Sequence, residues 1–403
     1  MYEKKLFDIA RIGGHIDGCA AVRLLEEIAA MPPVTAPPMA NRPLALYGAG
    51  NFGRLAKEYL DRVGVPVAFV VDQNPEPSLR DPFWAGTDIV ARAAVSAARK
   101  ECSQLVVSVC TTMYADLHQT LLAEGWTEVV PFYDFAQQYL SVHPLNNGWY
   151  TGCLGGNVAQ IEKVMARWAD TASRAHHLQF IAWHSLRQDW IFETAPVTQH
   201  DRYFIPEVMA VLEDDESFLD VGGHHGEVTL QFLQLSDGRC RQAWVLEPDR
   251  RNRHRIETEL RAAATSGVPI KILPFAAGEA DGSAAFFEGL GYASQFSELA
   301  EDTVDIRRID SLDTNPTFIK IHVEGHELTV LKGARKTLEK HRPIIAATSY
   351  HNHLGLWELP LWLMNTLPGY VFLLRLHSWC GTGAVIYAIP EERMKTRQGQ
   401  GAS

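Results

Sequence analysis

The sequence lacks a long apolar run: none approaches the roughly 20 residues that a membrane-spanning helix needs. Its first residues, Met1 to Lys5, are not followed by the apolar segment of a signal peptide. The six cysteines are scattered and no C-x-x-C pair occurs, so we expect reduced thiols rather than a disulfide framework. Together these absences predict a cytoplasmic protein without a membrane partner.

Basic residues are also in the minority. The chain has 37 Lys and Arg against 48 Asp and Glu, which gives a formal net charge of −11. Because non-specific binding to nucleic acid or to an acidic membrane needs a basic surface, both partners are disfavoured. A chain of 403 residues that is 46% hydrophobic can build two or three domains with sizeable cores. The sequence does not indicate an oligomeric state.

Composition divides the chain into five segments. A proline-rich stretch from Met31 to Pro43 follows a short predicted helix, and the residues after Glu391 are polar. A region rich in Trp, His and Ala shows no strand alternation and predicts a helical connector, in which the tryptophans are more typical of a core than of a sugar platform. The predicted segments are residues 1–40 (N-terminal helix and linker), 41–136 (a small Rossmann-like domain), 137–200 (helical connector), 201–390 (a second α/β domain) and 391–403 (polar tail).

A glycine-rich turn opens the first of these domains. The apolar run Leu44–Tyr47 leads into Gly48, Gly50 and Gly53 with G-x-G-x-x-G spacing, a helical pattern follows, and the next apolar run ends in Asp72. Strand, turn, helix, strand and terminal acid form the dinucleotide fingerprint in its expected context. The pattern predicts NAD, a nucleotide-sugar or the head of a carrier-bound acceptor at these four residues. The alternative is a fold used for recognition or assembly with an empty turn.

A second glycine turn lies in the later half of the chain. An apolar run ends at Asp220, and Gly222 and Gly226 precede a segment with helical spacing. Glycine lets the backbone turn sharply and a ligand come close, and the helix start offers free N–H groups. Twenty-five residues after Gly222, the run Ala243–Leu246 ends in Glu247, whose carboxylate can accept hydrogen bonds from ribose hydroxyls. These residues predict an adenosine-containing cofactor.

The spacing of this second turn, D-x-G-x-x-x-G, is similar to that of methyltransferases that bind S-adenosylmethionine. The later motifs resemble the FkbM-type methyltransferase family, and the resemblance covers about residues 203–390. His322 stands where the family usually has Asp, and His224 where it usually has Asn. The motifs are E-P-D from Glu247, P-F-A-A-G from Pro274, F-I-K-I-H-V-E-G-H-E-L from Phe318 and V-L-K-G-A from Val330.

Together with the first glycine turn, the resemblance implies an α/β protein with two Rossmann-like domains, of which the C-terminal one is a seven-stranded methyltransferase sheet with an antiparallel last strand. It also implies S-adenosylmethionine as cofactor and O-methylation of a hydroxyl on a sugar, glycan or polyketide-like metabolite. The partner is then a small-molecule, glycan or carrier-bound acceptor. For the donor we expect Asp220, Gly222 and Gly226 near its amino-acid part, Glu247 at the ribose, and Ala277 and Gly278 near the adenine.

The predicted strand Thr317–Val323 and the residue after it carry the candidate catalytic groups. Alternation places Lys320, His322 and Glu324 on one side of this strand. Buried ionisable groups are costly unless they are paired or face a cavity, and in such sheets the cavity lies beyond the carboxyl ends of the strands. We expect His322 to take the proton of the acceptor hydroxyl, with Glu324 as second candidate or as an orienting group, and Lys320 to neutralise a carboxylate. The alternative for His322 is a satisfied core histidine.

Loops at the same edge supply acceptor-side candidates. Ser294 lies in a stretch that resembles the family, and His351 and His353 follow the fifth predicted strand. Residues of this kind also serve as ordinary turn residues.

A metal is a competing role for the histidines. Six of them lie near predicted strand ends, where two or three could bind a divalent ion together with Glu324. Because no spacing matches an established zinc pattern, the sequence assigns no metal ligands. The six are His224, His225, His322, His326, His351 and His353.

Two other functions stay open. One is an NAD-dependent oxidoreductase or a sugar-nucleotide-modifying enzyme that uses the first glycine turn. The other is a non-catalytic binding protein that senses nucleotides, an alternative that the unusual His224 and His322 leave open.

Overall fold

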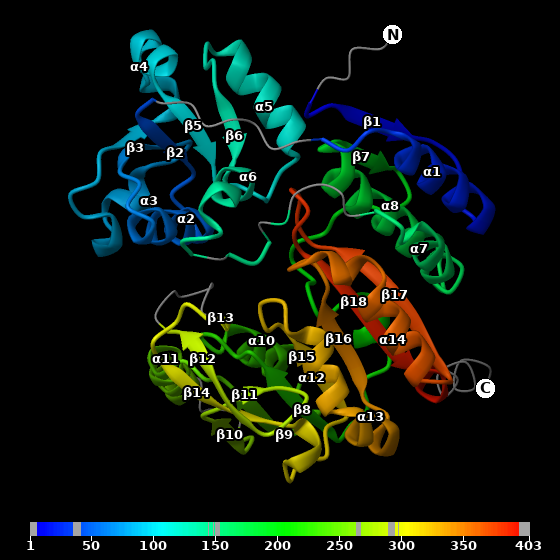
Figure 1. Cartoon of the computed structure of the whole chain (residues 1–403). Coiled ribbons are helices and arrows are strands. Elements are labelled where there is room, and N and C mark those ends of the chain that lie inside the picture. The colour runs from blue at the N-terminus through cyan, green and yellow to red at the C-terminus, as the bar shows by residue number, and fades with distance from the viewer. Residues whose placement is uncertain are drawn as a thin grey trace.

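The computed structural model describes residues 6–34, 42–143, 145–147, 149, 154–262, 267–288, 295–296 and 298–394. Figure 1 shows two α/β domains and a third group of helices that lies beside the C-terminal one. None of the helices in these ranges combines the length and the apolar character that crossing a bilayer requires.

The N-terminal domain is built on a five-stranded parallel sheet. Its elements are β2 (Leu44–Tyr47), α2 (Asn51–Arg62), β3 (Val67–Asp72), α3 (Glu76–Leu79), β4 (Ile89–Ala91), α4 (Ala97–Cys102), β5 (Gln104–Val107), α5 (Tyr114–Ala123), β6 (Val129–Pro131) and α6 (Phe132–Ala136). The strand order is β4-β3-β2-β5-β6, and each neighbouring pair is parallel. The central strands β2 and β5 are buried along their whole length, which is why they are continuous apolar runs in the sequence.

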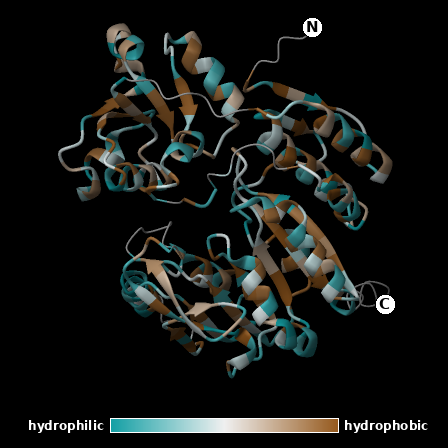
Figure 2. Cartoon of the chain, viewed as in Figure 1, coloured by the Kyte–Doolittle hydropathy of each residue, from teal (hydrophilic) through white to brown (hydrophobic). Residues whose placement is uncertain are grey.

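The C-terminal domain is built on a seven-stranded sheet. Its strands are β8 (Glu216–Val221), β9 (Cys240–Leu246), β10 (Ile270–Leu273), β15 (Phe318–Ile321), β16 (Ile344–Thr348), β17 (Tyr370–Leu376) and β18 (Ala384–Pro390). Their order is β10-β9-β8-β15-β16-β18-β17, and β18 runs antiparallel to both of its neighbours. The expected seven-stranded sheet with an antiparallel last strand is confirmed. Figure 2 shows that the strands are mainly hydrophobic, whereas the surrounding helices mix both kinds of residue.

Helices connect most of these strands, and a small sheet is inserted between β10 and β15. The helices are α9 (Pro206–Met209), α10 (Glu227–Leu235), α11 (Arg250–Ala262), α12 (Glu327–Gly333), α13 (Arg335–His341) and α14 (Glu358–Thr366). The inserted sheet has the order β11-β14-β12-β13, with β11 (Ala276–Ala277), β12 (Gly282–Phe287), β13 (Gln295–Phe296) and β14 (Thr303–Arg307). This sheet lies beside the carboxyl edge of the main one and contributes to the candidate site.

The segment before the N-terminal domain packs with the connector instead of with the domain that follows it. Here β1 (Ile9–Ile12) pairs in parallel with β7 (Asp189–Phe192), and α1 (Gly18–Ala30) packs on α7 (Val158–Met165) and α8 (Thr171–Leu186). In turn α8 packs on β17, so that α1 belongs to the same hydrophobic core as β15. Figure 1 shows these helices beside β17 and β18.

The connector was expected to contain helices without strands, but it also contains β7. The helix α8 ends where Arg187 adopts a left-handed conformation, and the chain then extends into the strand. The pairing partner of β7 is β1, near the start of the chain, so no local pattern indicates the strand. The expected core role of the tryptophans agrees with the burial of Trp168, Trp183 and Trp190.

Candidate active site

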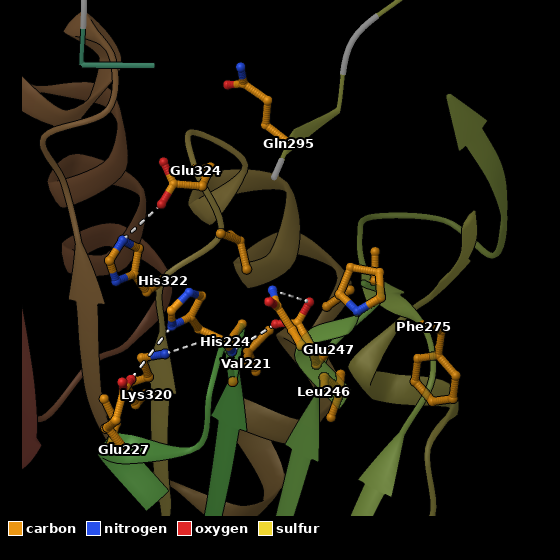
Figure 3. Close-up of a pocket in the computed structure, with 18 of the residues that line it drawn as sticks. Val221, His224, Glu227, Leu246, Glu247, Phe275, Gln295, Lys320, His322 and Glu324 are labelled. Carbon is orange, nitrogen blue, oxygen red and sulfur yellow. Dashed lines mark hydrogen bonds and ion pairs between the residues drawn. The ribbon is translucent and has the colours of Figure 1, made fainter. Parts of the chain in front are cut away.

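A cavity of about 300 Å³ lies at the carboxyl edge of the C-terminal sheet. The loops that follow three adjacent strands line it: Gly222 and His224 follow β8, Glu247 follows β9, and His322 and Glu324 follow β15. Parallel strands bring their carboxyl ends to one edge, where ligands of α/β sheets bind. In Figure 3 His322 and Glu324 lie on one side of the cavity and Glu247 on the other. The structure therefore brings the two predicted halves of the site together.

The glycine turn allows the loops after β8 and β15 to approach each other. Gly222 has a φ of +81°, and a Cβ atom there would overlap the carbonyl oxygen of His322. Any other residue at this position would be strained and would displace the β15 loop. Gly226 has a φ of +87° and precedes α10, but it packs against Ile256 and does not line the cavity.

Beneath the turn lies a buried ion pair between Asp220 and Lys320. The Lys320 ammonium donates to Asp220 Oδ1 at 2.8 Å and to the carbonyl oxygen of Gly222 at 2.6 Å. The other carboxylate oxygen of Asp220 accepts from Thr229 Oγ1 at 2.8 Å. Lys320 borders the cavity, whereas Asp220 does not. The expected charge neutralisation by Lys320 is present, and Asp220 acts on the site by holding the turn through Lys320.

Glu247 is a buried carboxylate at the edge of the cavity. Its Oε2 accepts from the backbone N–H of His224 at 2.7 Å, and its Oε1 accepts from the backbone N–H of Asp249 at 2.9 Å and from Asn252 Nδ2 at 3.4 Å. Burial raises the pKa of Glu247 to about 7. Each carboxylate oxygen has two acceptor positions, so acceptor capacity is left for ligand hydroxyls.

An apolar wall continues from Glu247. Phe275 and Ala277 come from the loop and short strand after β10, and Phe286 and Phe296 from the inserted sheet. Gly278 is not part of this wall. Its carbonyl oxygen packs closely against Gly333 of α12, where an added Cβ atom would overlap that oxygen. Flat aromatic and small apolar groups of this kind suit an adenine ring.

The opposite end of the cavity is polar. His322 Nδ1 is 2.8 Å from the hydroxyl of Tyr203, and its Nε2 is 3.1 Å from Glu324 Oε1 and 3.2 Å from the hydroxyl of Tyr350. Burial and the nearby cation of Arg202 hold the pKa of His322 well below its ordinary value, so the imidazole is neutral. Burial raises the pKa of Glu324 to about 7. A neutral imidazole and a carboxyl group that titrates near neutral pH thus face the cavity together.

Comparison with known proteins assigns this domain to a family. Residues 220–372 match the family model described as the methyltransferase FkbM domain. The C-terminal domain is an FkbM methyltransferase domain. The resemblance indicated by the motifs is confirmed for residues 220–372, and this domain is that of a methyltransferase that depends on S-adenosylmethionine.

Solved structures extend the likeness beyond the FkbM domain. The structure of methyltransferase FkbM from Methylobacillus flagellatus KT is 20% identical, with a TM-score of 0.60 over 92% of this chain and 100% of that chain. The fold of both domains and the connector is therefore shared with another protein. An rRNA methylase from Streptococcus thermophilus (12% identity, TM-score 0.30) covers 45% of this chain and 89% of its own. A precorrin-6y C5,15-methyltransferase from Geobacter metallireducens GS-15 (15% identity, TM-score 0.30) covers 48% of this chain and 93% of its own. No curated protein matches this chain.

Two residues ahead of the FkbM domain complete the polar end of its cavity. Arg202 donates to the Tyr350 hydroxyl at 2.8 Å, and its guanidinium lies 5.1 Å from the centre of the Tyr203 ring and 5.4 Å from that of Tyr350. Tyr203 has a φ of +72° and its backbone N–H donates to the Tyr387 hydroxyl at 2.9 Å. These contacts tie the segment before α9 to the end of β16 and to β18.

His351 lies between two carboxylates of the FkbM domain. Its Nδ1 is 2.6 Å from Glu327 Oε1, and its Nε2 is 3.6 Å from Glu324 Oε2. Burial alone lowers the pKa of His351, but the two carboxylates outweigh burial and raise it. The pKa of Glu327, which burial alone raises, is lowered to about 2 by His351. His353 is exposed and outside this cluster, and Ser294 lies outside the described residues.

The loop that carries Glu324 departs from the expected strand. The alternation argument assumed a strand as far as Val323, but β15 ends at Ile321, and Glu324 and Gly325 have φ values of +49° and +98°. Lys320 alone is therefore placed by strand alternation. The Asn146 side chain donates to the carbonyl oxygen of Glu324, and Asn352 Nδ2 donates to that of Gly325 at 3.0 Å. Tertiary contacts with these two asparagines hold a turn that strand alternation did not predict.

The first glycine turn has the geometry of its fingerprint. Gly48 has a φ of +105°, and a Cβ atom on Gly53 would overlap the carbonyl oxygen of Gly48. Gly50 is the N-cap of α2, and Asp72 Oδ2 accepts from the backbone N–H of Ala49 at 2.7 Å. NAD or a nucleotide-sugar at this turn stays a prediction.

Sequence reasoning missed several residues of the site. Asn252 and Glu327 occupy the first turns of helices, which is also their ordinary position in any helix. Arg202 and Tyr203 lie in a segment without motif or periodicity, so only the fold indicates them.

Proposed function

We propose that the protein transfers the methyl group of S-adenosylmethionine to a hydroxyl oxygen of a sugar, glycan or polyketide-like metabolite, free or bound to a carrier. The observation that carries the proposal is one cavity with a ribose-type carboxylate, Glu247, at one end and a proton-accepting pair, His322 and Glu324, at the other. An aliphatic hydroxyl is a weak nucleophile until a base takes its proton, so a polar end of this kind suits O-methylation.

The donor fits the first half of the cavity. Glu247 has acceptor capacity for the ribose hydroxyls, and Phe275 and Ala277 form an apolar wall for the adenine. The backbone at Gly222 and the start of α10 would hold the amino-acid part, with Asp220 acting through Lys320. Bound there, the donor supplies an electrophilic methyl group.

The acceptor would occupy the second half of the cavity. As its hydroxyl oxygen bonds to the methyl carbon, the carbon–sulfur bond breaks and the hydroxyl proton passes to Glu324. A carboxyl group with a pKa of about 7 is suited to accept a proton at neutral pH. The neutral His322, with its pKa held low, is the weaker base and orients Glu324 across the 3.1 Å contact. This assignment reverses the order of the two candidates that the sequence indicated.

We infer that the N-terminal domain serves recognition or assembly. Asp72 accepts the backbone N–H groups of Ala49 at 2.7 Å and of Asn74 at 2.8 Å, so its carboxylate stabilises the turn itself. At the ends of β5 and β6, the space beside Trp183 and Arg187 of the connector has a volume of about 10 Å³, which is room for about one water molecule. The connector therefore covers the edge of the N-terminal sheet at the ends of β5 and β6.

Calorimetric titration of the full chain with S-adenosylhomocysteine and, separately, with NADH tests the cofactor. We expect saturable binding of S-adenosylhomocysteine, which Glu247→Ala weakens. Titration with NADH should give no heat of binding that is lost when Asp72 is replaced. A transfer assay with methyl-labelled donor across hydroxyl-bearing sugars and polyketides then tests the reaction. Label that appears only in amine or thiol acceptors contradicts O-methylation.

A further inference from the structure

Three side chains that lie 2 to 29 positions apart in the sequence converge at the polar end of the cavity. Nε2 of His322 and a carboxylate oxygen of Glu324 are 3.1 Å apart, and Nε2 of His351 and the other carboxylate oxygen are 3.6 Å apart. One ligand-type atom from each residue lies within 4.8 Å of the other two. We propose that His322, His351 and Glu324 bind one divalent transition-metal ion.

The separations suit an ion without large movement of the backbone. A tetrahedral Zn²⁺ ion with bonds of about 2.1 Å holds its ligand atoms roughly 3.4 Å apart. The two separations above, 3.1 Å and 3.6 Å, run to different oxygens of Glu324 and lie on either side of that value, and one ligand atom from each residue lies within 4.8 Å of the others. Two imidazoles and one carboxylate are also the ligand set of catalytic zinc sites and of octahedral iron or manganese sites with open positions. Because His322 and Glu324 line the cavity, an open position would face it.

Both histidines are oriented through their second ring nitrogen. Nδ1 of His322 is 2.8 Å from the Tyr203 hydroxyl, and Nδ1 of His351 is 2.6 Å from Glu327 Oε1. In metal sites a contact of this kind fixes the ring and leaves the Nε2 lone pair for the ion. Glu327 is itself held by the Thr348 hydroxyl at 2.9 Å. A histidine buried only to fill the core would not require a carboxylate behind it.

The surrounding charges also favour a cation. The charged groups near the cluster are the cations of Arg202 and Lys320 and the carboxylate of Glu327, beside that of Glu324 within it. Lys320 is neutralised by Asp220, which leaves one guanidinium against two carboxylates when the imidazoles are neutral. The cluster therefore carries an excess of negative charge, which a divalent ion would balance.

The ion would take part in the proposed reaction at its open position. An acceptor hydroxyl bound there would have a lowered pKa and would lose its proton to water, after which the oxygen attacks the methyl carbon. Glu324 would then act as a ligand and not as the base. This role rests on the proposed methyl transfer, whereas binding of the ion does not.

Cobalt titration of the untagged, chelator-treated full chain tests the site, because Co²⁺ bound by nitrogen and oxygen absorbs visible light. We expect one Co²⁺ per chain. Glu324→Gln and His351→Ala should each weaken binding at least 10-fold. His353→Ala is the matched control, since His353 is exposed and outside the cluster, and it should bind Co²⁺ as the parent chain does.

Binding of S-adenosylhomocysteine in the same samples separates the two proposals and shows that each variant is folded. If the chain binds S-adenosylhomocysteine but takes up no Co²⁺, or if Glu324→Gln binds Co²⁺ as tightly as the parent, the metal site is overturned and the methyl transfer stands. If Co²⁺ binds as expected but no hydroxyl acceptor is methylated, the metal site stands and the proposed function fails.

Discussion

At the scale of single residues, three glutamates at the site show how the surroundings set the charge of a carboxyl group. Glu247 and Glu324 have their pKa raised to about 7 by burial, whereas the cationic His351 lowers the pKa of Glu327 to about 2. At neutral pH Glu327 is therefore a fixed anion, and the other two change charge in the range where an enzyme works. Opposed pKa shifts of this kind are typical of acid–base sites.

The titration of Glu247 predicts a pH dependence of donor binding. Its pKa of about 7 means that the ionised fraction rises about 10-fold between pH 6 and pH 8. Because the ionised carboxylate accepts hydrogen bonds from ribose hydroxyls more strongly, the affinity for S-adenosylhomocysteine should rise by up to that factor. In Glu247→Gln the rise should be absent, which calorimetry at three pH values can measure. The same slope in both proteins would assign the titration to another group.

The pair of Asp220 and Lys320 predicts a large loss of stability when it is broken. Lys320→Met leaves the fully buried Asp220 without its counter-ion, and this should cost about 3–5 kcal/mol in the free energy of unfolding. The double variant Lys320→Met with Asp220→Asn removes the uncompensated charge and should recover part of the loss. Urea unfolding of the three proteins measures the difference. Equal stability of the single and double variants would show that the buried charge is not the cause.

At the scale of elements, the site depends on turns that follow short strands. After β15 the chain leaves the sheet at Ile321, and the left-handed conformations of Glu324 and Gly325 direct the Glu324 carboxylate toward His322. A longer strand would have kept the alternation that the sequence suggested. The turn is instead decided by Asn146 and Asn352, which come from distant segments.

Gly222 and Gly238 both have a positive φ, and comparing them separates the energetic cost of backbone strain from the cost of losing a close backbone approach. Both have φ values near +80°, but a Cβ atom on Gly222 would overlap the His322 carbonyl oxygen, whereas one on Gly238 would meet nothing within 4 Å. Gly238→Ala should therefore cost only the backbone strain, about 1 kcal/mol. Gly222→Ala should cost more and should weaken S-adenosylhomocysteine binding at least 10-fold. Thermal unfolding and calorimetry compare the two variants, and similar effects in both would contradict the close approach.

At the scale of the whole molecule, a buried ion pair holds the N-terminal domain against the connector. Arg187 Nη2 donates to Asp134 Oδ1 at 2.8 Å, its Nε donates to Asp134 Oδ2 at 3.0 Å, and its Nη1 donates to the carbonyl oxygen of Trp183 at 3.0 Å. Both side chains are almost completely buried. The pair therefore links α6 to the end of α8, and through α8 to β17 of the FkbM domain.

Breaking this pair should uncouple the two domains. In Asp134→Ala the Arg187 guanidinium is left buried without its anion, which should cost about 3–5 kcal/mol. Calorimetry should then show the N-terminal domain unfolding at a lower temperature than the rest of the chain. Glu76→Ala, which removes the exposed ion pair between Arg80 and Glu76, is the control and should leave the unfolding profile unchanged. A single unshifted transition in Asp134→Ala would show that other contacts couple the domains.

The sequence by itself determined the features that depend on local chemistry. The two glycine turns, the acids Asp72 and Glu247 at strand ends, and the order of the FkbM motifs follow from residue type and spacing, because backbone conformation and strand burial act over a few residues. The position of His322 and Glu324 near the donor turn followed from the rule that carboxyl ends of parallel strands share an edge.

Only the tertiary structure decided which distant groups meet. Arg202 and Tyr203 reach the cavity, His351 joins His322 and Glu324, and β1 pairs with a strand about 180 positions later. These contacts depend on how buried faces pack, and no local pattern encodes that packing because each partner on its own has ordinary loop or strand chemistry. The same reason explains why the histidines match no metal pattern in sequence: His322 and His351 follow two adjacent strands, β15 and β16, and do not belong to one motif.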